Sequence, residues 1–374
     1  MAAKRRGHGE GSIYQRKDGR WVASLSLENR KRKYFYGDTR REVQEKLKVA
    51  LREQQQGTLV TSPQQSLKQF LERWLEDAYK PTVKLRSYVQ YRSIVNHHLI
   101  PGLGHVALQK LMPEMIHALY RQKLDDGLAA STVGFIHKVL CRALEDAMKW
   151  GLVARNVSKL VTLPRVEKFE SQILTVEQAR KLLEVARGTP LDALLLVALT
   201  TGMRHGELLA LRWADVDFEK GTVFVHRTVS RIGSYGLVES EPKTKSSKRR
   251  IVLPTVATAA LQKHQAEQVQ AKKIAGDSWQ DKGIVFCDVN GGFLESKTVL
   301  RRFRKLLQQA NLPRIRFHDL RHSAATILLS MGVNPKEVQE RLGHSSIMMT
   351  MDVYGHVLPS MSQEAANKMD DVFK

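Results

Sequence analysis

Two short polar segments, residues 61–63 and 164–172, divide the 374-residue chain into three parts with different patterns of apolar residues. A chain of this length is typical of two to three domains. The longest uninterrupted apolar run, residues 193–199, is far shorter than the roughly 18 residues of a membrane span. The first residues are basic and glycine-rich, so we expect no secretory signal and a cytoplasmic protein.

The chain is strongly basic, with a formal net charge of +22. Its 42% share of hydrophobic residues is a globular composition and excludes a chain that is disordered throughout. The charge favours a polyanionic partner. Nucleic acid is favoured over an anionic membrane because no basic amphipathic helix stands out. Two cysteines, Cys141 and Cys287, are too few for a disulfide framework or a four-cysteine zinc site, which indicates a reducing compartment.

Residues 1–60 predict three short strands followed by a helix. The β-prone runs contain aromatic residues and lie at residues 12–14, 21–27 and 33–36. Asp18-Gly19 is a hairpin signal, and Thr39 with Glu42 predicts a capping box for a helix that runs to about residue 56. This part has 15 Lys and Arg against 7 Asp and Glu. It predicts a small sheet that presses Arg and aromatic side chains into a DNA groove; the alternative is a solvated charged face.

Residues 64–165 predict an all-helical domain of four helices. Apolar residues recur at helical spacing from Leu67 to Leu75, and further helices are expected at residues 85–99 and 113–124. Ser131 is the expected N-cap of a last helix that ends at Gly151. The histidines of this part match no metal-ligand spacing, so we interpret them as surface or core residues: His97, His98, His105, His117 and His137.

Residues 173–374 predict a mixed domain, mainly helical, with a small antiparallel sheet. Thr175 with Gln178 begins one helix, and residues 193–211 form a second, apolar one. Strands are expected at residues 222–227 and 250–253. Late helices start near Lys297, Asp319 and Pro335, and Gly332 and Gly343 suit left-handed helix ends. The fold class is therefore α+β with several domains.

Five local patterns in this third part contain side chains that could take part in catalysis or binding. They are Arg204 with Glu207, the basic run at residues 242–250, His318 with Arg321, His344 after Gly343, and Tyr354. Alone, Arg204 and Glu207 would be an ordinary ion pair on one helix face. The basic run alone indicates a solvated hairpin loop or nonspecific phosphate binding. His318 and Arg321 would converge on one anion at a helix N-terminus. Tyr354 alone would be a core or capping residue.

Together and in this order, the patterns closely resemble the tyrosine recombinases, or phage integrase family. The strongest matches are TGMRHGELLALRW, HDLRHSAATILLSMG, VQERLGHSSIMMT and DVYGHV. The resemblance covers the whole chain. It implies an arm-type DNA-binding domain at residues 1–60, a helical core-binding domain at residues 64–165 and a catalytic domain at residues 173–374. The arm-type domain indicates an integrase of a phage or mobile element in a bacterial host.

The resemblance implies that Tyr354 attacks a DNA phosphate and forms a covalent 3′-phosphotyrosine with a free 5′-hydroxyl. Arg204 and Arg321 would fork the nonbridging oxygens, because guanidinium groups stay charged and bind bidentately. His318 and His344 would donate hydrogen bonds or shuttle protons. The general acid would be Lys243, with Lys245 as its rival. Glu207 would orient Arg204 or the local helix and would not transfer protons, and the resemblance implies no role for His205.

No P-loop or clear two-metal pattern is present in the sequence, so we expect no cofactor and no metal ion. The partners implied are double-stranded DNA at core and arm attachment sites and a homotetramer that exchanges strands through a Holliday junction. An excisionase or a host DNA-bending protein is a candidate further partner, and no membrane is expected. Two alternatives stay open: a type IB topoisomerase, and a DNA-binding regulator whose tyrosine is inert.

Overall fold

The computed structural model describes residues 11–27, 32–55, 64–166, 172–242 and 247–343, together with residues 346, 369–370 and 373. The chain divides into two compact units, Met1–Lys168 and Phe169–Lys374. Among the described residues, none of the helices combines the length and the hydrophobicity that a membrane-spanning segment needs.

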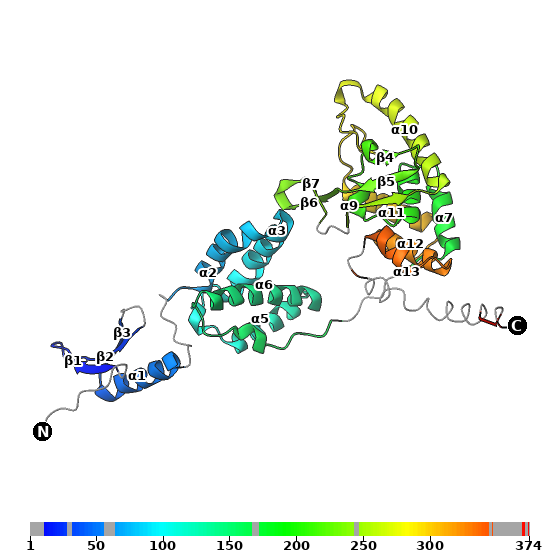
Figure 1. Ribbon diagram of the computed structural model, residues 1–374. Helices are drawn as coiled ribbons and strands as arrows, with labels where there is room; N and C mark the ends of the chain where they lie inside the picture. The colour runs from blue at the N-terminus through cyan, green and yellow to red at the C-terminus, as the bar shows by residue number, and fades with distance from the viewer. Residues whose placement is uncertain are drawn as a thin grey trace. The chain divides into compact units, whose positions relative to one another are not determined.

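The first unit begins with an antiparallel sheet in the order β1-β2-β3, followed by α1 (Figure 1). The elements are β1 (Ser12–Gln15), β2 (Trp21–Ser26), β3 (Arg32–Gly37) and α1 (Arg40–Gln55). Gly19 has a φ of +85°, which lets the chain turn tightly between β1 and β2. Thr39 Oγ1 accepts a hydrogen bond from the Glu42 N–H at 3.2 Å. The predicted strands, turn and helix start are confirmed.

The rest of the first unit is helical. Its helices are α2 (Leu67–Arg73), α3 (Leu85–Ile94), α4 (Ile100–Leu103), α5 (Pro113–Asp125) and α6 (Ala130–Lys149). A π-helical turn follows α2 at Trp74–Tyr79, and another joins α3 to α4 at Val95–Leu99. One buried core unites these helices, with Phe70 and Trp74 among its largest members. The predicted helical domain is confirmed.

One helix start in this unit was predicted wrongly. Helix α6 has Ala129, not Ser131, at its N-cap, and Ser131 lies inside the first turn. The backbone of Ala129 is extended there, which suits the position without a side-chain cap. Gly151, with a φ of +67°, ends the helix as predicted.

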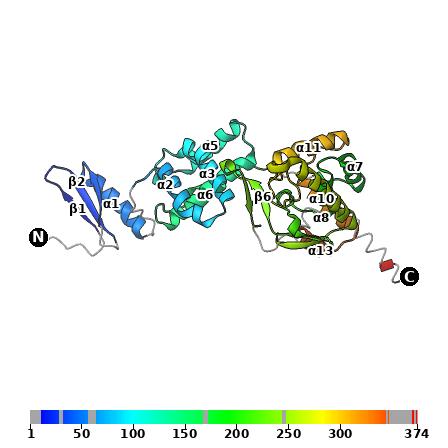
Figure 2. The same ribbon diagram turned by 90° about the horizontal axis from the view of Figure 1, so that it is seen from above.

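The second unit is mainly helical and is built around one buried helix. Its helices are α7 (Val176–Ala186), α8 (Asp192–Thr201), α9 (His205–Leu208), α10 (Thr255–Ala275), α11 (Ser296–Gln309), α12 (Asp319–Ser330) and α13 (Pro335–Leu342). Helix α8 packs against α7, α10 and α12. Helices α7, α8 and α10 can be followed in Figure 2. The sequence of α8 is apolar almost throughout because it is covered on several sides.

Short antiparallel strands complete this unit. β4 (Val216–Asp217), β5 (Thr222–Val225) and β8 (Arg249–Val252) form one sheet. β6 (Thr228–Arg231) pairs with β7 (Leu237–Ser240) in a separate hairpin. The predicted strands β5 and β8 and the predicted starts of α7, α11, α12 and α13 are confirmed. The β6–β7 hairpin and α10 were not predicted.

The second predicted helix of this unit, residues 193–211, is wrong as a single element. Gly202 ends α8 in the left-handed conformation, with a φ of +64°, and α9 begins three residues later. Arg204 therefore precedes a helix with an extended backbone (φ −68°, ψ 149°) instead of lying within one. The cause is Gly202 itself, which takes up a positive φ without strain.

Candidate active site

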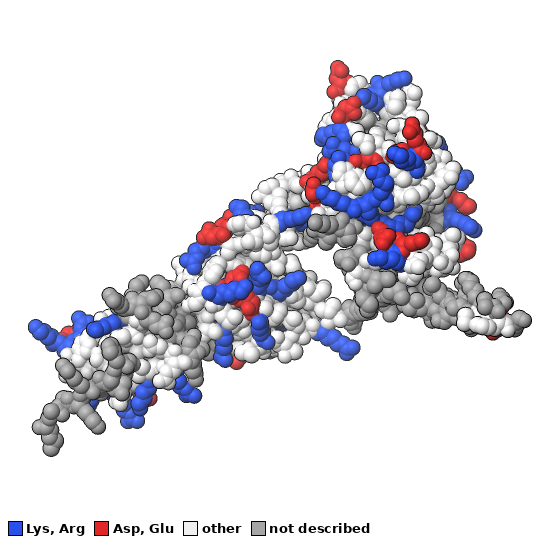
Figure 3. Space-filling model, viewed as in Figure 1, with Lys and Arg blue, Asp and Glu red and all other residues white. Residues whose placement is uncertain are grey.

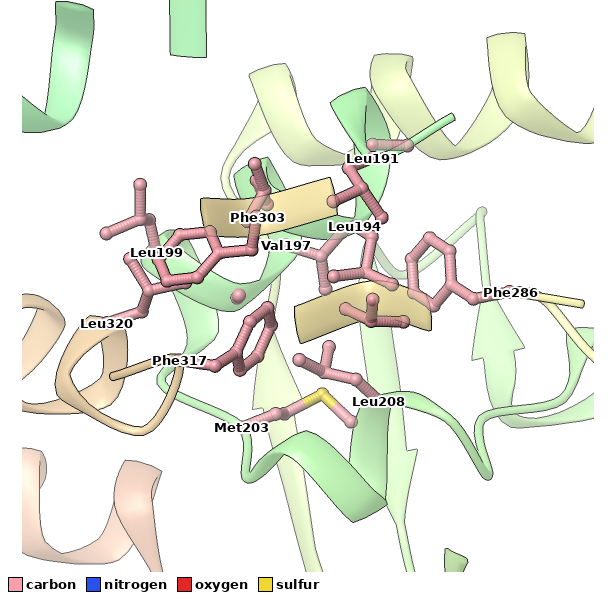
Figure 4. Close-up of a cluster of buried hydrophobic side chains, with 14 of the residues drawn as sticks. Leu191, Leu194, Val197, Leu199, Met203, Leu208, Phe286, Phe303, Phe317 and Leu320 are labelled. Atoms are coloured by element: carbon pink, nitrogen blue, oxygen red, sulfur yellow. The ribbon is translucent and has the colours of Figure 1, made fainter. Parts of the chain in front are cut away.

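The turn between α8 and α9 places Arg204. Met203 and Leu208, on either side of Arg204, point into the hydrophobic core (Figure 4). Arg204 is the N-cap of α9, and its backbone N–H donates to Glu207 Oε2 at 2.9 Å. Its Nη1 donates to Glu207 Oε1 at 2.8 Å. The predicted pair of Arg204 and Glu207 is thus confirmed, as a helix cap instead of two residues on one helix face.

The Glu207 carboxylate is almost completely buried and binds a second arginine. Arg249 Nη2 donates to Glu207 Oε2 at 2.9 Å, and Arg249 Nη1 donates to Oε1 at 3.3 Å. Burial alone would raise the pKa of Glu207, but the charges of Arg249 and Arg204 hold the pKa below its ordinary value. The carboxylate therefore stays ionised between two guanidinium groups at neutral pH.

The start of α12 places His318 and Arg321. Phe317 and Leu320, which precede them in the chain, pack into the core against Val197 of α8 and Phe303 of α11 (Figure 4). This packing fixes the first turn of α12 next to the end of α8. Arg321 is buried, and its Nη1 donates to the backbone oxygen of Gly202 at 2.8 Å. Because Gly202 is two residues before Arg204, the two predicted arginines come together at one turn.

His318 is the N-cap residue of α12. Part of its surface faces solvent. Desolvation of the ring by the surrounding protein, together with smaller effects of the charges of His322 and Arg321, lowers the pKa of His318 to about 4. The His318 and His322 rings meet edge to face, with centroids 5.0 Å apart. At pH 7 the His318 ring is neutral, so it can both donate and accept a hydrogen bond.

The end of α13 is tied to the same turn by arginine side chains. Arg204 Nη2 donates to the Gly343 oxygen at 3.1 Å, and Arg249 Nε donates to the Arg341 oxygen at 2.6 Å. Arg341 Nη2 in turn donates to the backbone oxygens of Thr200 and Val252, at 2.9 and 3.0 Å. The chain therefore leaves α13 close to Arg204, at Gly343, whose φ is +68°.

Four other predicted site residues lie outside the described residues: Lys243, Lys245, His344 and Tyr354. The chain leaves β7 toward Lys243 and returns at β8, and these two strands pair with β6 and β5, respectively. His344 directly follows Gly343.

One residue of this arrangement was missed by sequence reasoning. Arg249 belongs to the basic run at residues 242–250, which was interpreted as a solvated loop or as nonspecific phosphate binding, but it is buried on β8. The burial of β8 alternates, with Arg249 and Ile251 inside and Arg250 and Val252 outside. The signal was therefore available: side chains two apart in a strand share a face, and Ile251 marks the buried face.

Two family models match this chain and show which protein family it belongs to. The model of the phage integrase family matches residues 172–361, and that of the phage integrase N-terminal SAM-like domain matches residues 66–124. The chain belongs to the phage integrase family. It is therefore a tyrosine recombinase, an enzyme that breaks and rejoins DNA, of the integrase class found in phages and mobile elements.

Curated relatives are similar along most of the chain. An integrase of Streptomyces ambofaciens is 32% identical over 397 residues, covering 100% of this chain and 98% of the relative. A tyrosine recombinase XerC-like protein of Caldanaerobacter subterraneus is 31% identical over 363 residues, covering 91% of this chain and 92% of the relative.

Solved structures share the fold. The Tn1549 transposon integrase in complex with transposon right end DNA has a TM-score of 0.69 at 21% identity, covering 81% of this chain and 100% of that one. A lambda integrase tetramer bound to a Holliday junction has a TM-score of 0.58 at 21% identity, covering 93% of this chain and 96% of that one. At 93% coverage, the likeness to lambda integrase extends over both compact units of the chain.

Proposed function

We propose that this integrase inserts and excises its element by cleaving one DNA strand at a time with Tyr354 and exchanging strands through a Holliday junction. The observation that carries the proposal is the hydrogen bond from Arg321 to Gly202, which brings the Arg321 guanidinium to the turn that bears Arg204. Two guanidiniums at one turn form a site for a single phosphodiester. They stabilise the negative charge that grows on its nonbridging oxygens during cleavage.

In this mechanism the Tyr354 oxygen forms a bond to phosphorus as the bond to the 5′ oxygen breaks. The phenol proton leaves to an acceptor in the site, and Lys243 or Lys245 gives a proton to the departing 5′ oxygen. The neutral ring of His318 can accept or donate a hydrogen bond at the phosphate, and His344 would supply a second imidazole. The phosphotyrosine keeps the energy of the ester, so attack by a 5′-hydroxyl rejoins DNA without ATP.

We further propose that residues 1–60 bind arm-type sites, residues 64–165 bind the core site, and residues 173–374 carry out catalysis. Helix α1 packs on one face of the N-terminal sheet. The other face exposes three tyrosines: Tyr14, Tyr34 and Tyr36. Tyr14 and Tyr36 flank Val22 in register, and Arg32 extends the same face. Among the described residues no helix packs on this face of aromatic and basic side chains, which suits insertion into a DNA groove.

The assembly proposed is a homotetramer on two core sites, because the similar lambda integrase has been solved as a tetramer on a Holliday junction. On the face shown in Figure 3, basic side chains lie on the described surface of both compact units, with acidic ones among them. An excisionase or a host DNA-bending protein would set the direction of the reaction by changing how arm and core sites are bridged.

The test starts by finding the core site. Duplexes covering the DNA on both sides of the gene are incubated with the enzyme, and those that become covalently attached are sequenced. The recovered site is then made as a nicked duplex, which loses its short 5′-hydroxyl fragment after cleavage and traps the adduct. We expect a covalent complex with the wild-type enzyme and none with Tyr354→Phe.

Three results would contradict the proposal. Persistence of the complex in Tyr354→Phe would show that the nucleophile is another residue. Relaxation of a supercoiled plasmid that lacks the site, by a monomer, would favour a type IB topoisomerase. Tight binding without any complex would favour a DNA-binding regulator.

A further inference from the structure

The Arg249 side chain on β8 is buried and is hydrogen-bonded within the site. Its side chain is 6% exposed, and its nitrogens bind the Glu207 carboxylate and the backbone oxygens of Ser247 and Arg341. All three groups of the guanidinium, Nε, Nη1 and Nη2, therefore donate within the protein. Four of the five N–H bonds of the guanidinium are used in this way.

The charge of Glu207 depends on Arg249 more than on Arg204. A carboxylate that is 3% exposed is costly to keep ionised unless a nearby cation is buried with it. The Arg204 side chain is 35% exposed, so water screens part of its attraction, whereas Arg249 is as enclosed as Glu207. Loss of Arg249 would leave the carboxylate with a single, partly solvated partner.

Glu207 in turn sets the direction of Arg204. It holds both the backbone N–H and Nη1 of Arg204, while Gly343 holds Nη2. Arg249 also controls this second contact, because its Nε binds the oxygen of Arg341, two residues before Gly343. One buried side chain thus supports both groups that orient Arg204.

The geometry points to Arg249 as a positioning residue: it holds Glu207 and the end of α13 in place, and through them it aims the Arg204 guanidinium at the scissile phosphate. This inference rests on the proposed function, in which Arg204 contacts that phosphate. Arg249 acts through Arg204 and does not touch DNA.

The experiment measures the single-turnover rate of covalent complex formation on the recovered nicked core site, with the full chain. The variants are Arg249→Met, Arg249→Lys, Arg204→Met and the double variant Arg204→Met with Arg249→Met. Arg231→Met is the matched control, because Arg231 pairs with Glu295 on the surface of the same unit. Affinity for the intact core duplex and the thermal unfolding midpoint are measured for each.

We expect Arg249→Met to slow cleavage about 10- to 100-fold, as a small misplacement of a catalytic group does. Its affinity for the duplex should stay within about threefold of wild type, as should the cleavage rate of Arg231→Met. Arg249→Lys keeps the charge but loses the planar fork, so its rate should fall between those of Arg249→Met and wild type. In the Arg204→Met background, Arg249→Met should add less than about threefold, since both changes remove the same interaction.

The inference would be overturned if the cleavage rate of the double variant fell by the product of the two single losses. It would also be overturned if Arg249→Met cleaved at the wild-type rate. If Arg249→Met does not fold, Arg249→Lys carries the test; unfolding of both would make Arg249 a purely structural residue. The proposed function fails separately, when Arg204→Met cleaves at the wild-type rate. If Arg204→Met lowers the cleavage rate and Arg249→Met does not, only the positioning role of Arg249 is contradicted.

Discussion

One buried histidine of the second unit makes the stability of the protein depend on pH. The His205 ring packs on Phe317, with centroids 4.5 Å apart, and within the described chain its buried Nε2 has no hydrogen-bond partner. Burial lowers the pKa of His205 to about 4. The unfolded chain, where the pKa is about 6.5, therefore takes up this proton at a higher pH than the folded chain does. Stability from this residue is present above about pH 6.5 and is lost as the pH falls toward 4.

His205→Phe should therefore make the protein less sensitive to acid. The phenyl ring keeps the packing on Phe317 and cannot be protonated. Urea unfolding at pH 7.5 and at pH 5.0 gives the loss of stability on acidification, and we expect a smaller loss in the variant than in the wild type. An equal loss in the two proteins would contradict the assigned role of burial at His205.

The general acid can be assigned by changing the leaving group. A 5′-bridging sulfur in place of oxygen leaves as a thiolate without protonation, because thiols are far more acidic than alcohols. Lys243→Ala should slow cleavage of ordinary DNA by about 10²- to 10⁴-fold, the usual range for general acid catalysis, and should cleave the sulfur substrate at nearly the wild-type rate. Rescue of Lys245→Ala instead would assign the acid to Lys245. Rescue of neither would place the acid elsewhere.

Sequence could predict some of these residues better than others. Arg204, His318 and Arg321 are recognisable because they stand at characteristic spacings in motifs, and the structure brings Arg321 to the turn of Arg204. Arg249 was hidden in a run of basic residues, where charge suggested solvent. Its face could still be predicted, because Ile251 lies two residues later on the same strand and marks the buried side.

At the scale of elements, the break between α8 and α9 depends on Gly202. A residue with a Cβ would adopt the φ of +64° with strain, and its Cβ would lie 2.4 Å from Cδ2 of Leu342, which is fully buried in α13. The break therefore needs glycine both for its backbone and for the close approach of α13.

Gly202→Ala should destabilise the protein more than Gly188→Ala does. Gly188 has a similar φ of +72° but open space around its Cβ position, so it isolates the backbone cost of about 1–2 kcal/mol. The contact with Leu342 should add to that cost at Gly202. Urea unfolding of both variants measures the difference, and equal losses would show that α13 yields to the added methyl group.

Elements that begin with a capping residue could be predicted from the sequence. Elements with few buried side chains could not. Thr175 and Gln178 form the predicted capping box of α7, and Asn334 caps α13 as predicted. The β6–β7 hairpin has strands of four residues with few buried side chains. Helix α10 is 21 residues long but buries only two, Ala257 and Leu261, so its apolar periodicity is weak.

At the scale of the whole molecule, the proposed division of labour predicts what a truncation does. Removing residues 1–60 should weaken binding to arm sites while the recovered core site is still cleaved. Tyr34→Ala with Tyr36→Ala should reproduce the loss of arm binding, and Lys48→Ala, on the exposed side of α1, should not. Gel-shift titrations on separate arm and core duplexes measure both effects. A folded truncation that no longer cleaves core sites would contradict the division.

The hydrogen bonds around Arg204 have an electrostatic consequence. In the described chain, Arg204 and Arg249 share a single carboxylate, Glu207, and direct their remaining hydrogen bonds to peptide carbonyl groups. Arg341 donates to peptide carbonyl groups alone. A carbonyl group fixes the direction of a guanidinium without neutralising it, whereas each additional carboxylate would cancel one positive charge. The guanidiniums of the cluster are therefore oriented and still carry surplus positive charge, which a nucleic acid backbone can neutralise on arrival.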